Sequence, residues 1–449
     1  MKKVILTVLL SSVFLSGCFR LPEKPVTSFA NIQKAPAKEQ QWWRTFHDPL
    51  ITNLGKKLFE QNPELKIALT RIEEARALRR INSSALFPDI SGTVSTSRGN
   101  SEIGLTTPQT LTKGGFDTMW EADIFGANRA AIAASEARLQ ASYAHASDVR
   151  RIMIADLVQA IIEWQQARQI LSKTEDLLTV QSKQVALLRA RVEAGLINAA
   201  QLEQARAQKE QIAARIPLAK ASTKQAQYQI ERLLGQEPES LSPDLSRLIK
   251  TSLKIPKPDD TLNKYIDVVR DRPDVRVAAF NLQEAQADLR KAEADLWPRI
   301  TFSAFWGIQK TSNGLTAVTA SNPLWSLTNT LSAPLLNFGR LRGAVDAANV
   351  KAARAAVEYE KAVLLSLQEA KTAFSDYSHN FQAVEQQIAV LKHKQESIKL
   401  AKEQFERGLT DMTDVTAALA AHDEAAIVLI NRQAAAALAY IRWQKALGV

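Results

Sequence analysis

The sequence predicts a mainly α-helical protein that also contributes strands to a membrane β-barrel, built from two tandem repeats. Three observations lead to this fold class. Gly and Pro number only 16 each among 449 residues, and the chain is rich in Ala, Gln, Leu, Glu, Lys and Arg, which is typical of long helices. Matching motifs recur about 210 residues apart. Short segments with alternating apolar and polar residues interrupt the helical pattern in each repeat.

The N-terminus has the layout of an export signal. Two lysines precede an apolar run at residues 4–15, which is too short to span a bilayer. Small residues, Ser16 and Gly17, then precede Cys18 in an arrangement that resembles a bacterial lipoprotein box. We therefore expect residues 1–17 to be a signal peptide and Cys18 to carry lipid. An ordinary signal peptide with an incidental cysteine is the alternative.

The expected destination is the outer membrane. Residue 19 is Phe, whereas lipoprotein sorting rules associate Asp at this position with retention in the inner membrane. No later stretch offers about 18 apolar residues without charge, so no transmembrane helix is expected after the signal.

Composition also excludes several kinds of site. A single cysteine excludes a disulfide framework and a zinc site with two or more thiolates. The five His are scattered without metal-binding spacing, and no Gly-rich loop follows a strand, so we expect no enzyme activity, metal or cofactor. The net charge of +10 comes from basic residues dispersed among Gln and Glu, which is typical of a solvated coiled-coil surface; nucleic acid is not expected as a partner.

Two sets of motifs define the repeats. Asn62-Pro63 matches Arg272-Pro273, and Phe87-Pro88 matches Trp297-Pro298, both at an offset of 210. Three further pairs share an offset of 213: Phe125-Gly126 with Phe338-Gly339, Gly195-Leu196 with Gly408-Leu409, and Leu234-Gly235 with Leu447-Gly448. We expect repeats at 62–235 and 272–449, with the segment 18–61 and the linker 236–271 forming a belt at mid-height.

Each repeat begins with a helix and a β-hairpin. The helices are expected at about 62–86 and 272–296, because a residue that precedes proline disfavours the helical conformation. Period-two segments then predict strands at about 89–98, 114–123, 299–308 and 324–334. The Ser-, Thr- and Gly-rich stretches 99–114 and 309–323 are expected to be the hairpin loops.

A very long helix follows in each repeat, at about 127–194 and 340–407. Its apolar residues repeat every seven positions, which predicts a left-handed coiled coil. These residues are Leu157, Trp164, Leu171, Leu178, Val185 and Val192, and then Ala370, Tyr377, Val384, Leu391, Ile398 and Phe405. Return helices of about 36 residues run to Leu234 and Leu447, and we expect each to stack end to end with the first helix of its repeat.

The strands require more than one copy of the chain. Four short strands cannot close a barrel, and an open sheet edge is not tolerated in lipid. Two copies supply eight strands and three supply twelve, so the helices would extend an outer-membrane barrel as a tube of about 100 Å. A structural coiled-coil lipoprotein without a pore is the alternative, although such a protein has no use for a half-apolar strand such as 299–308.

Several stretches resemble the signature segments of the outer membrane efflux proteins, the TolC-like outer membrane factors, and their lipoprotein branch. They are Trp42–Leu50, Asn62-Pro63, Trp120–Gly126, Arg272–Val275 and Gly408–Thr410. The resemblance implies a homotrimer with a twelve-stranded barrel in outer membrane lipid and a twelve-helix periplasmic tunnel. It also implies docking to a periplasmic adaptor protein and an inner-membrane pump. Drug efflux and the export of metals or proteins are not separable from the sequence.

The two glycine turns are the candidate docking sites. By the resemblance, Gly195, Leu196, Arg407, Gly408 and Leu409 lie at the tunnel tip, where the adaptor binds. Glycine also makes such a turn for purely conformational reasons. The family often has a charged residue before the first glycine, and Ala194 departs from that pattern, so the two tips are expected to bind unequally.

Two carboxylates follow the second turn. By the resemblance, the position of Asp414 faces the narrow end of the pore, where three copies would form an acidic ring, and Asp411 is the second candidate for this aperture. Carboxylates at the start of a helix also stabilise the helix by roughly 0.3–1 kcal/mol, which is the structural alternative. Asn198 and Gln201 occupy the matching positions of the first repeat.

Overall fold

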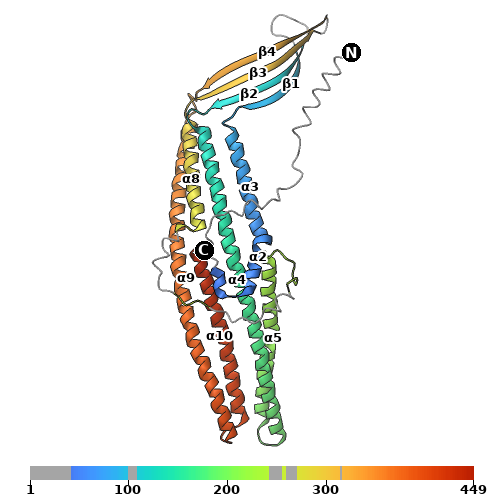
Figure 1. Cartoon of the computed structure of the whole chain (residues 1–449), viewed down its shortest axis with the longest axis vertical. Coiled ribbons are helices and arrows are strands. Elements are labelled where there is room, and N and C mark those ends of the chain that lie inside the picture. Colours follow the sequence, from blue (N-terminus) through green and yellow to red (C-terminus); the bar gives the residue numbers. More distant parts are fainter. Residues whose placement is uncertain (1–41, 100–108, 242–254, 259–269, 314–315, 449) are drawn as a thin grey trace. The chain divides into compact units, whose positions relative to one another are not determined.

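The computed structural model describes residues 42–99, 109–241, 255–258, 270–313 and 316–448 (Figure 1). All of them belong to one compact unit, Gln40–Val449. The signal peptide, Cys18 and most of the linker 236–271 lie outside the described residues. The described chain begins with a 3₁₀ helix, η2 (Trp42–Phe46), and helix α2 (Pro49–Gln61), which precede the first repeat.

The two repeats have the same order of elements, which confirms the duplicated fold class. The first contains α3 (Pro63–Ser84), β1 (Asp89–Gly99), β2 (Gln109–Ala122), α4 (Ala127–Glu193) and α5 (Ala199–Leu233). The second contains α8 (Pro273–Ala294), β3 (Arg299–Asn313), β4 (Thr316–Ser332), α9 (Arg340–Glu406) and α10 (Met412–Ala446). Corresponding helices have equal lengths of 22, 67 and 35 residues.

Prolines and glycines set the helix ends. α3 and α8 carry proline in their first turn, where the missing N–H costs no hydrogen bond. Both stop four residues before the next proline, at Ser84 and Ala294. α4 and α9 begin after Gly126 and Gly339, whose φ angles of 83° and 89° suit glycine.

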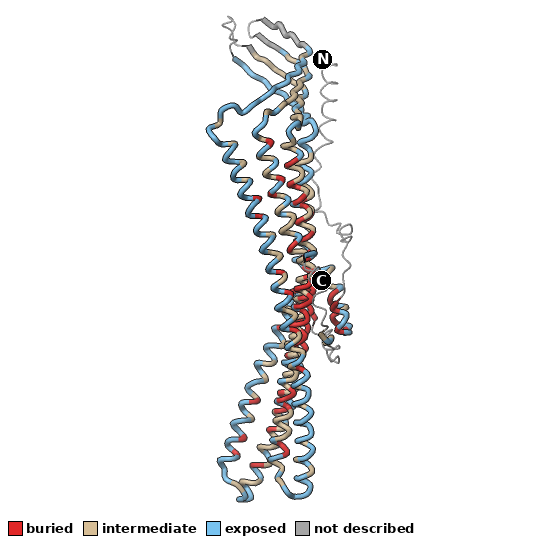
Figure 2. Tube along the Cα trace, turned by 90° about the vertical axis from the view of Figure 1, so that its left-hand side faces the viewer, coloured by how far each residue is buried: buried red, intermediate tan, exposed pale blue. Residues whose placement is uncertain are grey.

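Helix α4 is the centre of the packing. It contacts α3 and α5 of its own repeat and α8 and α10 of the second repeat, whereas α9 contacts α8 and α10. The heptad residues Leu157, Trp164, Tyr377 and Val384 are buried, but those closer to the glycine turns are only half-buried or exposed. Figure 2 shows this gradient as a buried zone in the middle of the long helices.

The first and return helices meet end to end along the long helix, as the lengths suggested. Asn62 caps α3 by accepting from Leu65 N (2.9 Å), and its Nδ2 donates to Leu233 O at the end of α5 (2.6 Å). In the second repeat Arg272 precedes α8, and its Nη1 donates to Ala446 O at the end of α10 (2.9 Å). One side chain therefore joins two helices in each repeat.

The four strands form one antiparallel sheet in the order β1-β2-β3-β4. The strands are longer than the periodicity suggested, because residues 109–113, 309–313 and 316–323, which were expected to be loop, are strand. The remainder of the first expected loop, residues 100–108, lies outside the described residues. Segment 109–113 has a composition typical of a loop. Its backbone nevertheless pairs with 309–313 and continues the ladder of hydrogen bonds between β2 and β3. Composition marked these stretches as polar, but pairing with a neighbouring strand decided their conformation.

An aromatic cluster anchors the N-terminal segment at mid-height. The rings of Trp42 and Phe46 pack edge-on against Tyr440, with centroids 6.2 and 5.5 Å away. Tyr377 of α9 stacks on Trp443 of α10 at 5.6 Å. Such pairs contribute roughly 0.5–1.5 kcal/mol each beyond their buried area. Segment η2 is thus fixed to α10, far along the sequence from it.

Helix α10 is long and apolar enough to cross a membrane by length and composition, with a mean hydropathy of 1.2 in its most apolar stretch. Nearly half of that stretch (44%) is buried in the protein, and α10 packs on α4 and α9. Its Ala-rich faces are explained by close helix packing.

Candidate functional site

The two glycine turns have the same backbone geometry. Gly195 N donates to Val192 O and Leu196 N donates to Arg191 O, both at 2.9 Å, which is the Schellman arrangement. Gly408 and Leu409 make the equivalent bonds to Phe405 and Gln404, also at 2.9 Å. The φ angles of Gly195 and Gly408 are 72° and 71°. These turns, residues 194–198 and 407–411, are called the tip turns below.

The leucine of each tip turn is exposed. Leu196 and Leu409 are 72% and 70% exposed, whereas a Schellman turn commonly buries this residue against its own helix. Arg407 is also exposed. The turns therefore present one apolar side chain each, and the second turn adds a guanidinium.

The residue that starts each return helix is a helix cap. Asn198 Oδ1 accepts from Ala200 N (3.0 Å), and Asp411 Oδ1 accepts from Thr413 N (2.6 Å). Both are extended N-cap residues, the position where Asn and Asp are favoured. Asp411 therefore has the helix-stabilising role that the sequence offered as the alternative to lining the aperture.

Asp411 also connects the two tip turns. Its Oδ2 accepts from Arg191 Nη1 at 2.7 Å, so the last turn of α4 is bonded to the first turn of α10. The hydrogen bond from Arg191 lowers the pKa of the Asp411 carboxyl below its ordinary value, against a smaller opposing effect of burial. Both oxygens of Asp411 are thus engaged within one chain.

Asp414 differs from Asp411. It lies in the first turn of α10, is exposed, and has no cation within ion-pair distance among the described residues. Its backbone N donates to Asp411 O (3.2 Å). Of the two carboxylates proposed for the aperture, Asp414 is the one whose side chain is available.

Sequence reasoning missed Arg191. Its signal was weak, because Arg191 is one of many basic residues on α4 and its match in the second repeat is Gln404. Two features are consistent with its role but do not identify its partner. A basic side chain in the last turn of a helix is favoured by the helix dipole, and Asp411 replaces the Asn198 of the first repeat.

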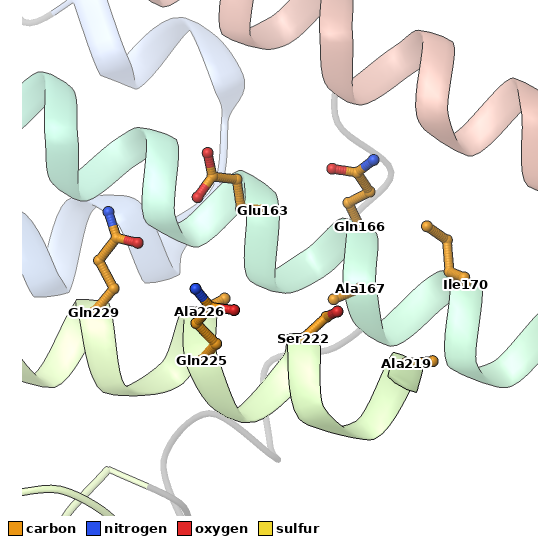
Figure 3. Close-up of a pocket in the computed structure, with 9 residues that line it drawn as sticks. All are labelled: Glu163, Gln166, Ala167, Ile170, Ala219, Ser222, Gln225, Ala226 and Gln229. Carbon is orange, nitrogen blue, oxygen red and sulfur yellow. The ribbon is translucent and has the colours of Figure 1, made fainter. Parts of the chain in front are cut away.

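A polar cavity of about 340 Å³ lies between α4 and α5 (Figure 3). Small side chains on α5, including Ala219, Ser222 and Ala226, leave this space open. Gln166 reaches across from α4 to α10, where its Nε2 donates to Asn431 Oδ1 (2.8 Å). Within the described parts of the chain, His, Cys, Asp and Glu side chains do not gather in groups of three that would hold a metal.

The sheet has one apolar and one polar face, because residues opposite each other in neighbouring strands share a face. The apolar face carries Ile90, Val94, Phe116, Trp120, Ile300, Phe302, Ala304, Trp306, Ile308, Trp325, Leu327 and Leu331. The polar face carries Ser91, Thr93, Ser95, Asp117, Glu121, Thr301, Ser303, Ser326, Thr328 and Thr330. Met119 and Leu324 also lie on the polar face, and Thr118 and Asn329 interrupt the apolar face. Large apolar side chains on the first face are exposed in the single chain.

Phe305 is the aromatic exception on the polar face. A Cβ added to Gly115 or Gly307 would lie 2.9 Å from Phe305 Cζ. The ring therefore lies over two paired glycines and covers backbone that has no side chain of its own. Its place follows from local packing in the sheet.

A family model decides the affiliation. The model of the outer membrane efflux proteins matches residues 54–236 and again 267–449, one match for each repeat. The chain belongs to the outer membrane efflux protein family. The duplicated helices and the half-apolar sheet are thus the architecture of an outer-membrane efflux channel subunit.

Relatives and solved structures agree with this family. The chain is 26% identical to nodulation protein T of Rhizobium leguminosarum bv. trifolii, over 97% of this chain and 93% of the relative. It is also 26% identical to the probable efflux pump outer membrane protein TtgC of Pseudomonas putida, over 91% and 88% of the two chains. The outer-membrane channel OprN is similar in structure, with 28% identity, a TM-score of 0.78 and coverage of 91% and 92%. The outer membrane protein VceC of Vibrio cholerae shares the fold, with 20% identity, a TM-score of 0.78 and coverage of 91% and 98%.

Proposed function

We propose that three copies of this chain form the passive outer-membrane conduit of a tripartite efflux system. The observation that carries the proposal is the four-stranded sheet, which has an apolar and a polar face and leaves both of its outer strands, β1 and β4, unpaired among the described residues. A sheet with this distribution suits a barrel wall with lipid on one side and water on the other.

The number of copies follows from closing the barrel. Unpaired edges cannot face lipid, so β4 of one copy must pair with β1 of the next. The resemblance to the TolC-like factors favours three copies and twelve strands. The 67-residue helices, each about 100 Å long, would then continue the barrel as a periplasmic tunnel.

The tip turns dock the tunnel to a periplasmic adaptor, which in turn connects it to an inner-membrane pump. The exposure of Leu196 and Leu409 beside the glycine turns supports this assignment, since two apolar side chains on a rigid turn give a partner something to bury. Arg407 adds a charge on the second turn only.

Asp414 lines the periplasmic aperture. In the proposed trimer, three Asp414 carboxylates gather in one ring, which concentrates cations at the narrow end. Asp411 contributes indirectly by bonding α10 to Arg191. Cys18, outside the described residues, carries the lipid that anchors the N-terminal segment in the outer membrane.

The pump selects the cargo, and the conduit itself performs no chemistry. Light scattering on the detergent-extracted full chain tests the assembly. We expect a protein mass of three copies of the 49.6 kDa precursor chain, less the signal peptides. A single copy, or two, contradicts the proposed trimer.

A further inference from the structure

We infer that the space between α4 and α5 is a binding site for a small organic cation, with a primary ammonium group on a short apolar body (Figure 3). The site lies about 36 Å along α4 from the tip turn, counted from Ile170 to Ala194. It goes beyond the proposed function, which uses the sheet, the tip turns and the aperture. One chain supplies every lining residue, so the site does not depend on how many copies assemble.

Two opposed helix faces form the site. Residues three, four and seven positions apart share one face of a helix, and the lining residues of both helices follow this spacing. α4 contributes Glu163, Gln166, Ala167 and Ile170, and α5 contributes Ala219, Ser222, Gln225, Ala226 and Gln229. In Figure 3, Gln225 and Gln229 extend from α5 toward α4.

The size and the opening of the site suit a compact ligand. Its volume of about 340 Å³ is near the lower end of the range for small-molecule sites. Ser222 and Gln225 are exposed, so a ligand reaches the space from solvent. Ala167 and Ala226 are buried and Ile170 is half-buried, and these three side chains give an apolar body a surface to cover.

The polar groups of the site have acceptors to spare. Glu163 Oε1 accepts from Gln159 Nε2 (2.9 Å), while its Oε2 has no donor among the described residues. Gln166 uses its Nε2 on Asn431, which leaves its side-chain carbonyl oxygen available. Ser222 donates its hydroxyl hydrogen to a backbone carbonyl of α5 and can still accept. An ammonium group has three N–H donors and no acceptor, so it complements this set.

Charge favours a cation over a neutral ligand. Glu163 is the one charged side chain among the lining residues, and the described parts of the chain place no basic nitrogen within ion-pair distance of it. Glu163 is half-buried, and its attraction for a cation is therefore stronger than that of a fully exposed carboxylate. An anion would meet this carboxylate without any compensating group.

The matching face of the second repeat has the opposite charge. Positions there follow at an offset of 213 along α9 and α10. The acidic residue is kept as Asp376, but Arg432 and Arg442 take the places of Ala219 and Gln229. Two guanidiniums beside one carboxylate disfavour a second cation. The proposed site thus belongs to the first repeat alone, and the second repeat supplies matched controls.

Three probes of similar shape test the preference for a cation. At pH 7 benzylamine is a cation, benzyl alcohol is neutral and benzoate is an anion. We would titrate each into the detergent-purified full chain and follow binding by ligand-observed NMR. All samples carry Asp414→Ala, so that the proposed aperture ring does not bind the cation. Benzylamine should bind at least about tenfold more tightly than the other two probes, because only benzylamine makes hydrogen bonds between charged groups.

Three variants locate the site. Glu163→Gln keeps the size of the side chain, removes its charge and should reduce the affinity for benzylamine to that for benzyl alcohol. Ala219→Arg introduces the residue that the second repeat carries as Arg432, and it should abolish binding by occupying the space and repelling the cation. Asp376→Asn, the matched change in the second repeat, should leave the affinity unchanged. Circular dichroism checks that each variant is folded.

Three results would overturn the site. They are equal affinities of the parent chain for benzylamine and benzyl alcohol, equal binding of benzylamine by the parent chain and Glu163→Gln, and an equal loss of binding in Asp376→Asn. Each of them leaves the proposed function intact if light scattering still gives three copies. A single copy by light scattering would instead overturn the proposed trimer and leave this site in place.

Discussion

The two repeats have the same order of elements and equal helix lengths but differ in the side chains that join their helices. At the mid-height joint, the first repeat uses the neutral Asn62 and the second uses the charged Arg272. At the tip turns, the first repeat begins its return helix with Asn198 and the second with Asp411. The two repeats keep the same helix lengths, and the second repeat has charged residues at both joints.

The joint of the second repeat gathers several groups around one buried guanidinium. Besides Ala446 O, Arg272 bonds to the carboxylates of Asp274 (2.6 Å) and Glu369 (2.7 Å). Burial opposes the charge of Arg272, but the two carboxylates outweigh it and raise its pKa. The guanidinium also lies at the negative end of the α10 dipole, where a cation is favoured. Asn62 makes a simpler joint, with two hydrogen bonds to backbone groups and a weak one from Nδ2 to Met153 Sδ (3.7 Å).

The largest expected effect is therefore at Arg272. Arg272→Ala leaves Asp274, Glu369 and the end of α10 without their partner, and we expect a loss of about 3–5 kcal/mol in the free energy of unfolding. Asn62→Ala removes only neutral hydrogen bonds and should cost about 1–3 kcal/mol. Denaturant unfolding followed by circular dichroism compares the two variants. Equal losses would show that the charged joint of the second repeat stabilises the fold no more than the neutral joint of the first.

The next effect concerns the tip turns. Gly408→Val places a β-branched residue at a positive φ, which costs about 1–2 kcal/mol and displaces Leu409. Leu409→Asp keeps the turn and removes its apolar side chain. Both variants should form trimers yet fail to restore efflux in a strain that depends on this channel. Gly195→Val and Leu196→Asp are the matched changes in the first repeat. Normal efflux at normal expression of the Gly408 and Leu409 variants would exclude the second turn as a docking site.

A smaller effect is expected at the ion pair between the tips. Asp411→Asn keeps the cap of α10 but loses the pair with Arg191, a partly exposed interaction of roughly 0.2–1 kcal/mol. In the proposed trimer, the equivalent contact between copies would involve Gln404 and Asn198, which are neutral. The pair therefore holds α4 to α10 within a copy only. Asp411→Asn and Arg191→Gln should raise the resting conductance equally, because each removes the same ion pair. Asn198→Asp, the matching position of the first repeat, is the control.

The pH dependence of this pair follows from its pKa. Because the pKa of Asp411 is lowered in the folded chain, the stabilisation is present above the unfolded value of about 3.9 and is lost as the pH falls through the folded value. This contribution should thus be constant from pH 5 to 8. A change in conductance within that range that Asp411→Asn abolishes would contradict the assignment.

The smallest structural effect is expected at Asp414, whose exposed side chain supports no contact in the single chain. Asp414→Ala should leave unfolding nearly unchanged but weaken the block of the pore by divalent or trivalent cations, since clustered carboxylates bind such ions through several oxygens. Single-channel recording with cations added from the periplasmic side measures this block. Equal block in the wild type and in Asp414→Ala would leave Asp414 with helix stabilisation alone.

Much of the fold was predictable from one sequence because each motif that marks a helix end or a turn occurs in both repeats. Pro88 and Pro298 marked matching helix ends, and Gly195 and Gly408 marked matching turns. The strand lengths were not predictable, because segment 109–113 becomes strand through pairing with β1 on one side and β3 on the other. The Arg191–Asp411 bond was missed for a similar reason. It joins residues 220 positions apart, and neither residue carries a local pattern that names its partner.

Conductance of the purified full chain in planar lipid bilayers tests the central claim most directly. Our account predicts stepwise openings of uniform size, because three copies close one barrel around one water-filled path. The same preparation should have the mass of three copies and a largely helical circular dichroism spectrum. A folded trimer that inserts into the bilayer and conducts no ions under any applied voltage would contradict the channel. It would favour a structural coiled-coil lipoprotein without a pore.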